Sequence, residues 1–238
     1  MSAIDDKMTP IKQTRMQKIV RKIIHFFCRA NIFILSRHEI TGREYIPEHG
    51  PMLVVANHIS MADQYFIAVN VTRRMMYMAK EELFRVHPIS LVVQAFGAFP
   101  VRRGGMDRKA LEQARRVLES GLALFVFPEG TRSKNAKLQR GYTGSASIAM
   151  ESHVPILPVA VTGLENVKKG PLWWVFHRHQ LTVTITFGKP FHLPEAREPS
   201  KTYLYEMSDY IMEHIAELLP PDYRGYYADK VESHDAKD

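Results

Sequence analysis

The sequence predicts an α/β fold in which helices flank a mostly parallel central sheet, and two observations lead to this prediction. Short apolar runs alternate along the chain with longer stretches of helical periodicity, which is the order of elements in βα units. The 238 residues are 45% hydrophobic and 24% charged, a composition typical of a globular domain and not of a disordered chain. We therefore expect one domain of this class, preceded by a helical arm and followed by a polar tail.

The first predicted element of the domain is a fully apolar strand. Residues 52–56 contain no polar side chain, as expected of a strand that is covered on both faces. A helical stretch at 62–71, a strand at 75–79 and a helix at 88–96 follow. A short strand at 99–101 then leads into a pair of glycines. Strands and helices thus alternate, which favours a parallel sheet.

The second half of the domain continues this alternation. Asp107 is suited to cap a helix that Gly121 ends. The later elements are a strand at 122–127, a helix at 142–152, strands at 156–161 and 181–187, and a closing helix at 203–218. Residues 181–187 alternate polar and apolar side chains, so this strand should lie near a sheet edge. The polar residues from 223 to 238 predict a frayed tail.

The positive charge of the protein is concentrated in an N-terminal arm, residues 1–41. The whole chain has a net charge of +7, and most of this excess comes from the arm. Between Thr14 and Ser36, apolar residues recur at helical spacing, with most of the basic residues opposite them. Either Thr14, or Thr9 followed by Pro10, is suited to open this helix.

A basic amphipathic helix is suited to a membrane interface with anionic headgroups, so we predict that the arm docks the protein on a membrane surface. Its apolar residues are too interrupted to span a bilayer, and no small-residue cleavage site marks a signal peptide. The alternative is a helix that packs on the domain core with its basic face in solvent. No recognised nucleic-acid-binding fold follows the arm, so we expect no nucleic-acid partner. A second segment, Trp173–Phe176, fits either membrane contact or a loop over the core.

The sequence excludes several familiar cofactor and metal sites. One cysteine, Cys28, allows no internal disulfide framework and no cysteine cluster for zinc or iron–sulfur. The glycine-rich patterns of dinucleotide-binding and P-loop proteins do not occur. We therefore expect neither a bound cofactor nor a resident metal.

Polar side chains follow several of the predicted strands at the points where the strands end. In open α/β sheets, ligands bind beyond the carboxyl ends of the strands. The strand at 52–56 runs directly into a segment that contains His58 and Asp63. On a strand-to-helix turn these side chains can meet, and an aspartate bound to one ring nitrogen leaves the other as a base. This pair suits proton abstraction from a hydroxyl; the alternative is that His58 is an ordinary polar turn residue.

Four segments, in order along the chain, resemble the motif blocks of one enzyme family. They are NHISMAD at 57–63, GAFPVRRG at 97–104, FPEGTRS at 127–133 and VPILPV at 154–159. Together with AKEELF at 79–84, they make the chain similar to the glycerolipid acyltransferases, and within them to the 1-acyl-glycerol-3-phosphate (lysophosphatidate) acyltransferases. The resemblance runs from about Gly42 to Phe191 and implies an acyltransferase domain at 42–222 with the glycerol-phosphate acyltransferase-like fold.

The resemblance implies transfer of a fatty acyl group from acyl-CoA or acyl-carrier protein to the free hydroxyl of 1-acyl-glycerol-3-phosphate, which forms phosphatidate. It makes His58 the general base and Asp63 the partner that orients it. It also implies direct transfer without an acyl-enzyme, and the sequence agrees, because the only thiol lies in the arm and no G-x-S-x-G nucleophile elbow is present. The lysophospholipid acceptor would come from the bilayer, so the implied location is the cytoplasmic face of the cell membrane, as a peripheral (monotopic) protein.

Further residues match positions of the family's motifs that the resemblance assigns to substrate binding. The cations among them are Lys80, Arg103 and Arg132. They are suited to a phosphate monoester, or alternatively to structural ion pairs. Glu129 either positions the glycerol or braces its loop through backbone N–H groups. Gly130 permits a close approach of the backbone to the acceptor. Thr131, the next residue of the motif, is also a predicted substrate-binding residue.

Three other functions stay open at this point. The first keeps the chemistry but acylates another lysolipid or a glycolipid hydroxyl; Met61 and Ala62, where family members often carry bulkier residues, bear on that choice. The second is a non-catalytic membrane-binding module, which the intact pair of His58 and Asp63 disfavours. The third is a metal hydrolase built from this pair and Glu129, which lacks a dense ligand cluster.

Overall fold

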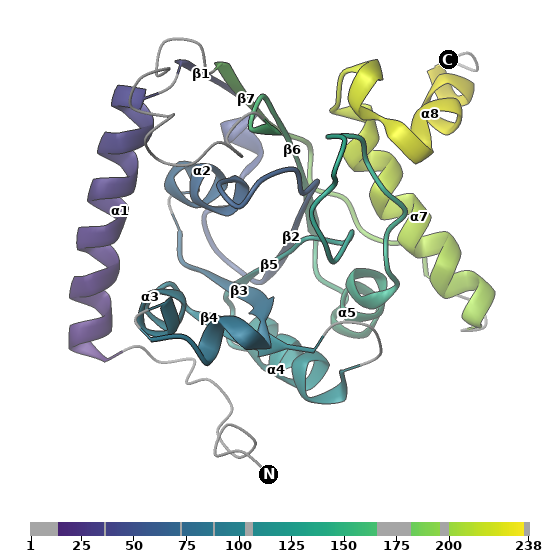
Figure 1. Ribbon diagram of the computed structural model, residues 1–238. Coiled ribbons are helices and arrows are strands. Elements are labelled where there is room, and N and C mark those ends of the chain that lie inside the picture. The colour runs from purple at the N-terminus through teal and green to yellow at the C-terminus, as the bar shows by residue number, and fades with distance from the viewer. Residues whose placement is uncertain are drawn as a thin grey trace.

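The computed structural model describes residues 14–35, 37–71, 73–87, 89–102, 107–165, 182–195 and 200–235. Within them lies a seven-stranded sheet with the order β1-β7-β6-β2-β5-β3-β4. The strands are β1 (Arg37–Thr41), β2 (Met52–Ala56), β3 (Met75–Lys80), β4 (Ala98–Val101), β5 (Ala123–Val126), β6 (Ile156–Thr162) and β7 (Thr182–Phe187). Neighbouring strands pair in parallel except β6 and β7, which are antiparallel. The predicted fold class is confirmed (Figure 1).

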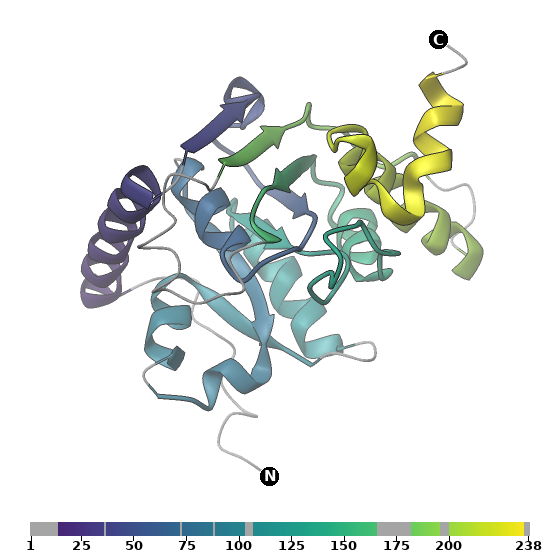
Figure 2. The same ribbon diagram turned by 45° about the horizontal axis from the view of Figure 1, so that its top comes forward.

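Helices cover both faces of this sheet. On one face lie α4 (Arg108–Glu119), α5 (Gly144–Ser152), α7 (Lys201–Glu217) and α8 (Ala228–Asp235). The other face carries α2 (Asp63–Asn70), α3 (Ile89–Ala95) and, packed against both of these helices, α1 (Arg15–Leu35). Short 3-10 helices are η1 (Arg43–Tyr45), η2 (Glu81–Phe84), η4 (Pro221–Tyr223) and η5 (Gly225–Tyr227). Helix α1 and the α7–α8 pair therefore lie on opposite sides of the molecule (Figures 1 and 2).

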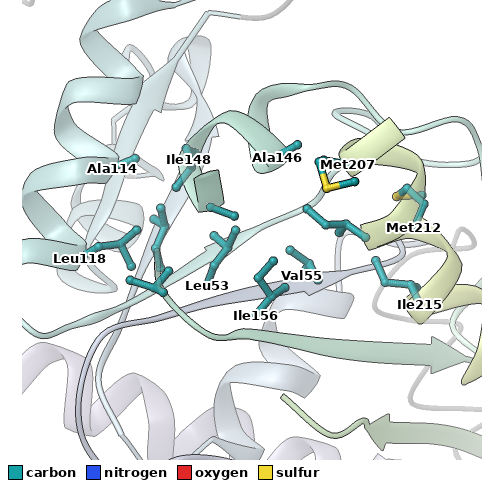
Figure 3. Packing of buried hydrophobic residues seen from close by; sticks show 14 of the residues in the cluster. Leu53, Val55, Ala114, Leu118, Ala146, Ile148, Ile156, Met207, Met212 and Ile215 are labelled. Atoms are coloured by element: carbon teal, nitrogen blue, oxygen red, sulfur yellow. The ribbon is translucent and has the colours of Figure 1, made fainter. Parts of the chain in front are cut away.

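Strand β2 contributes buried side chains to the apolar core on both faces of the sheet. All five of its residues are buried. Leu53 and Val55 pack with α4, α5 and α7, as Figure 3 shows, whereas Val54 packs with α2 on the opposite face. Burial on both sides is the physical reason why the run at 52–56 contains no polar residue.

The helices and strands predicted between residues 52 and 218 are present, with ends that differ by one or two residues. Asp107 caps α4, because its side chain accepts a hydrogen bond from the Ala110 N–H at 3.3 Å. The alternating strand at 182–187 lies one strand in from the edge of the sheet.

The edge strand itself, β1, was not predicted. Residues 37–41, which belong to the predicted arm, pair in parallel with β7. Only Ile40 among them is strongly apolar, and an edge strand of this kind is stabilised mainly by its backbone hydrogen bonds. Its composition therefore gave little sign of a strand, and the sheet begins before Gly42.

The segment after Tyr223 is folded, which contradicts the predicted frayed tail. Residues 225–235 form η5 and α8, and the side chains of Tyr227 and Val231 are 0% and 1% exposed. Tyr227 ends η5, and Val231 lies four positions later on α8, so the two side chains form one narrow apolar face. This narrow apolar face is enough to bury the segment against α7, although its overall composition is polar.

Helix α1 begins directly after Thr14, the later of the two predicted starts. Thr14 Oγ1 accepts a hydrogen bond from the Gln17 N–H at 3.2 Å, and Gln17 Oε1 accepts one from the Thr14 N–H at 2.9 Å. This reciprocal pair is a capping box. Thr9 and Pro10 lie outside the described residues. None of the described helices combines the length and the hydropathy that crossing a bilayer requires.

Candidate active site

The turn that follows β2 is fixed by a buried asparagine. Asn57 Nδ2 donates to the Val161 carbonyl at 2.8 Å, and Asn57 Oδ1 accepts from the Val161 N–H at the same distance. The side chain thus takes the place of a backbone partner and links the end of β2 to β6. This role of Asn57 was not predicted from the sequence; the available signal was its position between a buried strand and His58.

The turn between β2 and α2 brings His58 and Asp63 into contact, as their spacing predicts. His58 Nδ1 lies 2.8 Å from Asp63 Oδ2. The same oxygen accepts the backbone N–H groups of Ile59 and Ser60 at 2.7 and 2.8 Å. Asp63 is the first residue of α2 and is fully buried. Because Asp63 engages Nδ1, Nε2 is the ring atom left to accept a proton.

Both the ring and the backbone of His58 are held in place. Its ring stacks on Phe127 with centroids 3.8 Å apart and planes 12° from parallel. Its N–H donates to Glu129 Oε1 at 2.7 Å, and its carbonyl accepts from the Ser133 N–H at 2.7 Å. A side chain that is held in this way before any ligand binds needs little reorganisation when it acts.

Glu129 braces its loop from within the protein. The side chain is 1% exposed, Oε1 takes the His58 N–H, and Oε2 accepts the N–H and the side-chain amide of Gln139 at 3.0 and 3.2 Å. Of the two predicted roles, these contacts describe the brace. Burial raises the pKa of Glu129 from 4.5 to about 7, against the hydrogen bonds from His58 and Gln139, and burial also raises the pKa of Asp63.

We expect the raised pKa of Glu129 to make folding stability pH-dependent. Between pH 4.5 and about 7 the folded protein holds a proton that the unfolded chain has released. The free energy of unfolding should therefore fall as the pH rises through this window, by up to about 3 kcal/mol. The variant Glu129→Gln cannot titrate and should lose less stability between pH 5 and pH 8, as measured by urea unfolding at both pH values.

The control for this measurement is Glu217→Gln, an exposed glutamate on α7. Its unfolding free energy should keep the pH dependence of the wild type. Asp63, whose pKa is also raised, remains in both variants and contributes a residual decrease. Parallel stability–pH curves for wild type and Glu129→Gln would show that Glu129 does not carry the effect.

Two of the three predicted phosphate-binding cations, Lys80 and Arg132, lie among the described residues. Lys80 ends β3 and is exposed, with Nζ 3.1 Å from Glu82 Oε1. Arg132 is exposed on the loop that Glu129 braces. Arg103 lies outside the described residues, as does the Trp173–Phe176 segment.

Gly130 and Thr131 lie on the same loop. Gly130 has φ +63°, a left-handed conformation that favours glycine, and a Cβ there would lie 3.0 Å from the ring of Tyr142. A tight turn against an aromatic ring is one reason for this glycine, and the predicted close approach to the acceptor stays a prediction. Thr131 is exposed.

An apolar pocket lies against α2, the helix that begins at Asp63. Its lining comes from α2, β3, η2, α3 and β4 and consists of Gln64, Tyr65, Ala68, Tyr77, Ala79, Leu83, Val92, Val93, Phe96 and Ala98. The ring of Phe96 stacks with His25 of α1, with centroids 5.6 Å apart. Helix α1 therefore packs against one wall of this pocket. Among the residues that the structure describes, no group of three or more His, Cys, Asp or Glu side chains is arranged to hold a metal ion.

Comparison with known families decides where this arrangement belongs. The family described as "Acyltransferase" matches residues 37–162, a stretch that contains His58, Asp63 and Glu129. The chain belongs to the acyltransferase family. The resemblance inferred from the four motif segments is thereby confirmed.

Several curated relatives of this acyltransferase-family chain are named 1-acyl-sn-glycerol-3-phosphate acyltransferases. It is 27% identical over 183 residues to the 1-acyl-sn-glycerol-3-phosphate acyltransferase of Bacillus subtilis (strain 168), which covers 76% of this chain and 87% of that one. It is 28% identical over 156 residues to the chloroplastic enzyme BAT2 of Brassica napus (62% and 44% covered). It is 29% identical over 154 residues to the human beta enzyme (62% and 55%). The chain spans about half the length of these plant and human relatives.

A solved structure shares the fold over most of the chain. The crystal structure of the 1-acyl-sn-glycerophosphate (LPA) acyltransferase PlsC from Thermotoga maritima matches with a TM-score of 0.65 and 27% sequence identity. The match covers 94% of this chain and 84% of that one. It therefore includes parts of the chain that lie outside residues 37–162.

Proposed function

We propose that this protein transfers a fatty acyl group from acyl-CoA or acyl-carrier protein to the free hydroxyl of 1-acyl-glycerol-3-phosphate, and so forms phosphatidate. The observation that carries the proposal is the 2.8 Å contact between His58 Nδ1 and Asp63 Oδ2 at the carboxyl end of β2. The names of the relatives from Bacillus subtilis and Thermotoga maritima support the choice of acceptor.

The proposed step is a direct acyl transfer. His58 Nε2 takes the hydroxyl proton as the acceptor oxygen attacks the thioester carbonyl and the new C–O bond forms. The C–S bond then breaks, and the departing thiolate takes the proton back from the imidazolium. Asp63 holds the ring in the productive tautomer and stabilises the imidazolium while it exists. The apolar pocket beside α2 offers space of the right chemistry for an acyl chain.

Membrane docking by α1 is a part of this proposal that the exposure of its side chains supports. Among the described side chains of α1, the exposed apolar ones are Met16, Ile19, Ile23, Phe26 and Phe27. At about 100° per residue, they cover about 100° of the helix circumference. The exposed basic side chains Arg15, Lys18, Lys22 and Arg29 lie directly beside this stripe. The helix contacts the domain through a third side, which contains Arg21 and His25.

This arrangement favours a membrane over the alternative of plain packing. In plain packing the apolar stripe would face the domain, whereas here it faces outward with cations at its border, as in helices that lie in an anionic membrane interface. We accordingly place the protein on the cytoplasmic face of the membrane as a peripheral protein, where the acceptor is dissolved in the bilayer.

One assay tests the whole proposal. Purified protein is incubated with oleoyl-CoA or oleoyl-acyl-carrier protein and a panel of lysolipids and glycolipids, and the products are identified by mass. We expect phosphatidate from the lysophosphatidate reaction. Acylation of a different hydroxyl would make the acceptor assignment wrong, and a thioester that is never consumed would favour the non-catalytic module.

Substitution of Arg132 tests how the acceptor phosphate is recognised. Charge-assisted hydrogen bonds contribute about 1.5–3 kcal/mol, so Arg132→Ala should lower kcat/KM for lysophosphatidate roughly 10- to 100-fold. Acylation of a lysolipid without a phosphate monoester should change much less. The matched control is Arg115→Ala on α4, where the guanidinium pairs with Glu112 and Glu119. Equal losses with both acceptors would contradict phosphate recognition by Arg132.

A further inference from the structure

The loop that follows β5 has two sides that are held by different parts of the chain. We call residues 129–142 the site loop; it has no regular secondary structure before α5 begins at Gly144. One side of it is bound to His58, through Glu129 Oε1 and the Ser133 N–H, each at 2.7 Å. A loop of this kind keeps its position only through such individual contacts.

The other side of the site loop is held by the C-terminal segment, residues 223–227. The Leu138 N–H donates to the Tyr223 carbonyl at 2.8 Å, and the Leu138 carbonyl accepts from the Tyr226 N–H at 3.0 Å. Both backbone groups of Leu138 are therefore bound by the C-terminal segment, and the Leu138 side chain is buried. In Figure 1 the loop between β5 and α5 passes beside this yellow segment.

Tyr227 adds a side-chain contact from the same segment. Its hydroxyl accepts the Gly141 N–H at 3.2 Å and donates to Asp209 Oδ1 of α7 at 2.8 Å. The side chain is fully buried, so each of these polar groups would lose a partner inside the protein if the hydroxyl were absent. Tyr227 thus ties the site loop to α7.

Gly225 shows how closely the two segments approach each other. It has φ +51°, and a Cβ at this position would lie 2.3 Å from the Leu138 carbonyl oxygen. Any side chain there would push Leu138, and with it the loop, away from its present position.

The contacts form a continuous chain to the candidate base. Leu138 and Gly141 flank Gln139, and Gln139 presents both its N–H and its side-chain amide to Glu129 Oε2. Glu129 in turn accepts the His58 N–H through its other oxygen. A shift of about 1 Å in a group of this kind can reduce a catalysed rate by as much as 100-fold.

We propose that the C-terminal segment positions the active site, with Tyr227 as a positioning residue that acts through the site loop and Glu129 on His58. The segment lies outside residues 37–162, the part of the chain that matches the family. The kinetic part of this inference rests on the proposed function, whereas the coupling to Glu129 does not.

Two measurements on full-length Tyr227→Phe test the inference. In an acyl-transfer assay, kcat should fall about tenfold, with little change in the KM of either substrate. In an NMR titration of side-chain carboxyl groups, the titration midpoint of Glu129 should be higher in this variant than in the wild type. The hydrogen bonds from Gln139 favour the charged carboxylate, and they would weaken when the site loop loses its contact with Tyr227. The titratable neighbours His58 and Asp63 are unchanged in this variant. Gly225→Ala should give the same two effects through the displaced loop.

The control is Val231→Ala, which removes buried apolar volume from α8 but none of the hydrogen bonds that hold the site loop. It should lower stability while leaving both kcat and the Glu129 midpoint unchanged. The inference is overturned if Tyr227→Phe leaves either quantity at its wild-type value, or if Val231→Ala changes both as much as Tyr227→Phe does. If no variant and no wild type transfers acyl groups, the proposed function fails, and the Glu129 midpoint still reports whether Tyr227 positions the loop.

Discussion

Replacement of His58 by alanine should lower the rate of acyl transfer by roughly 10²- to 10⁴-fold while the protein stays folded, because general-base catalysis by a positioned side chain typically contributes this much. His58 is held on three sides, by Asp63, Phe127 and Glu129, and its Nε2 remains to accept the proton. Single-turnover kinetics with saturating acyl-CoA and lysophosphatidate would measure the loss in the chemical step. Folding is checked by circular dichroism and by thermal unfolding.

Asp63→Asn supplies the second arm of this test. An amide in place of the carboxylate no longer stabilises the imidazolium, so turnover should also fall. His49→Ala is the matched control, since the side chain of His49 is 94% exposed and makes only a long contact with Glu48. Acyl transfer at near the wild-type rate by folded His58→Ala would exclude His58 as the base.

Disruption of the apolar stripe on α1 should abolish most binding to membranes. The variant with Ile19→Ser, Ile23→Ser and Phe26→Ser replaces side chains that are 46%, 50% and 69% exposed and belong to the outward-facing stripe. Burial of each such side chain contributes about 1.5–3 kcal/mol, so the partition coefficient should fall about 100-fold or more. Sedimentation with vesicles of phosphatidylglycerol and phosphatidylcholine measures it.

The basic side of α1 makes a separate, salt-dependent contribution. Lys18→Glu with Lys22→Glu should weaken binding to anionic vesicles, because each cation near such a surface contributes about 1 kcal/mol and salt screens this attraction. Arg108→Glu with Lys201→Glu, at the exposed first positions of α4 and α7, is the control, because it also reverses two positive charges. Substitutions are preferable to deletion of residues 1–41, because β1 is part of the sheet. A serine variant that binds anionic vesicles as tightly as the wild type would make plain packing the better interpretation of α1.

Most of the fold was predictable because its signals are local. A strand that is buried on both faces, such as β2, must be apolar throughout, and the periodicity of a helix such as α4 depends only on its own residues. The contact between His58 and Asp63 was predictable for the same reason, since a short turn joins the two residues. The sequence by itself therefore determined the fold class, the family and the central pair of the candidate site.

Only the tertiary structure decided the contacts between residues that are distant in the sequence. Glu129 meets the His58 N–H across 71 positions, and Asn57 meets Val161 across 104. A glutamate or asparagine in the sequence does not indicate its hydrogen-bond partner, because a buried polar side chain can bond to any donor or acceptor that packing brings to it. The same reason applies to β1, which needs β7 as a neighbour, and to Tyr227, whose burial requires both α7 and the site loop.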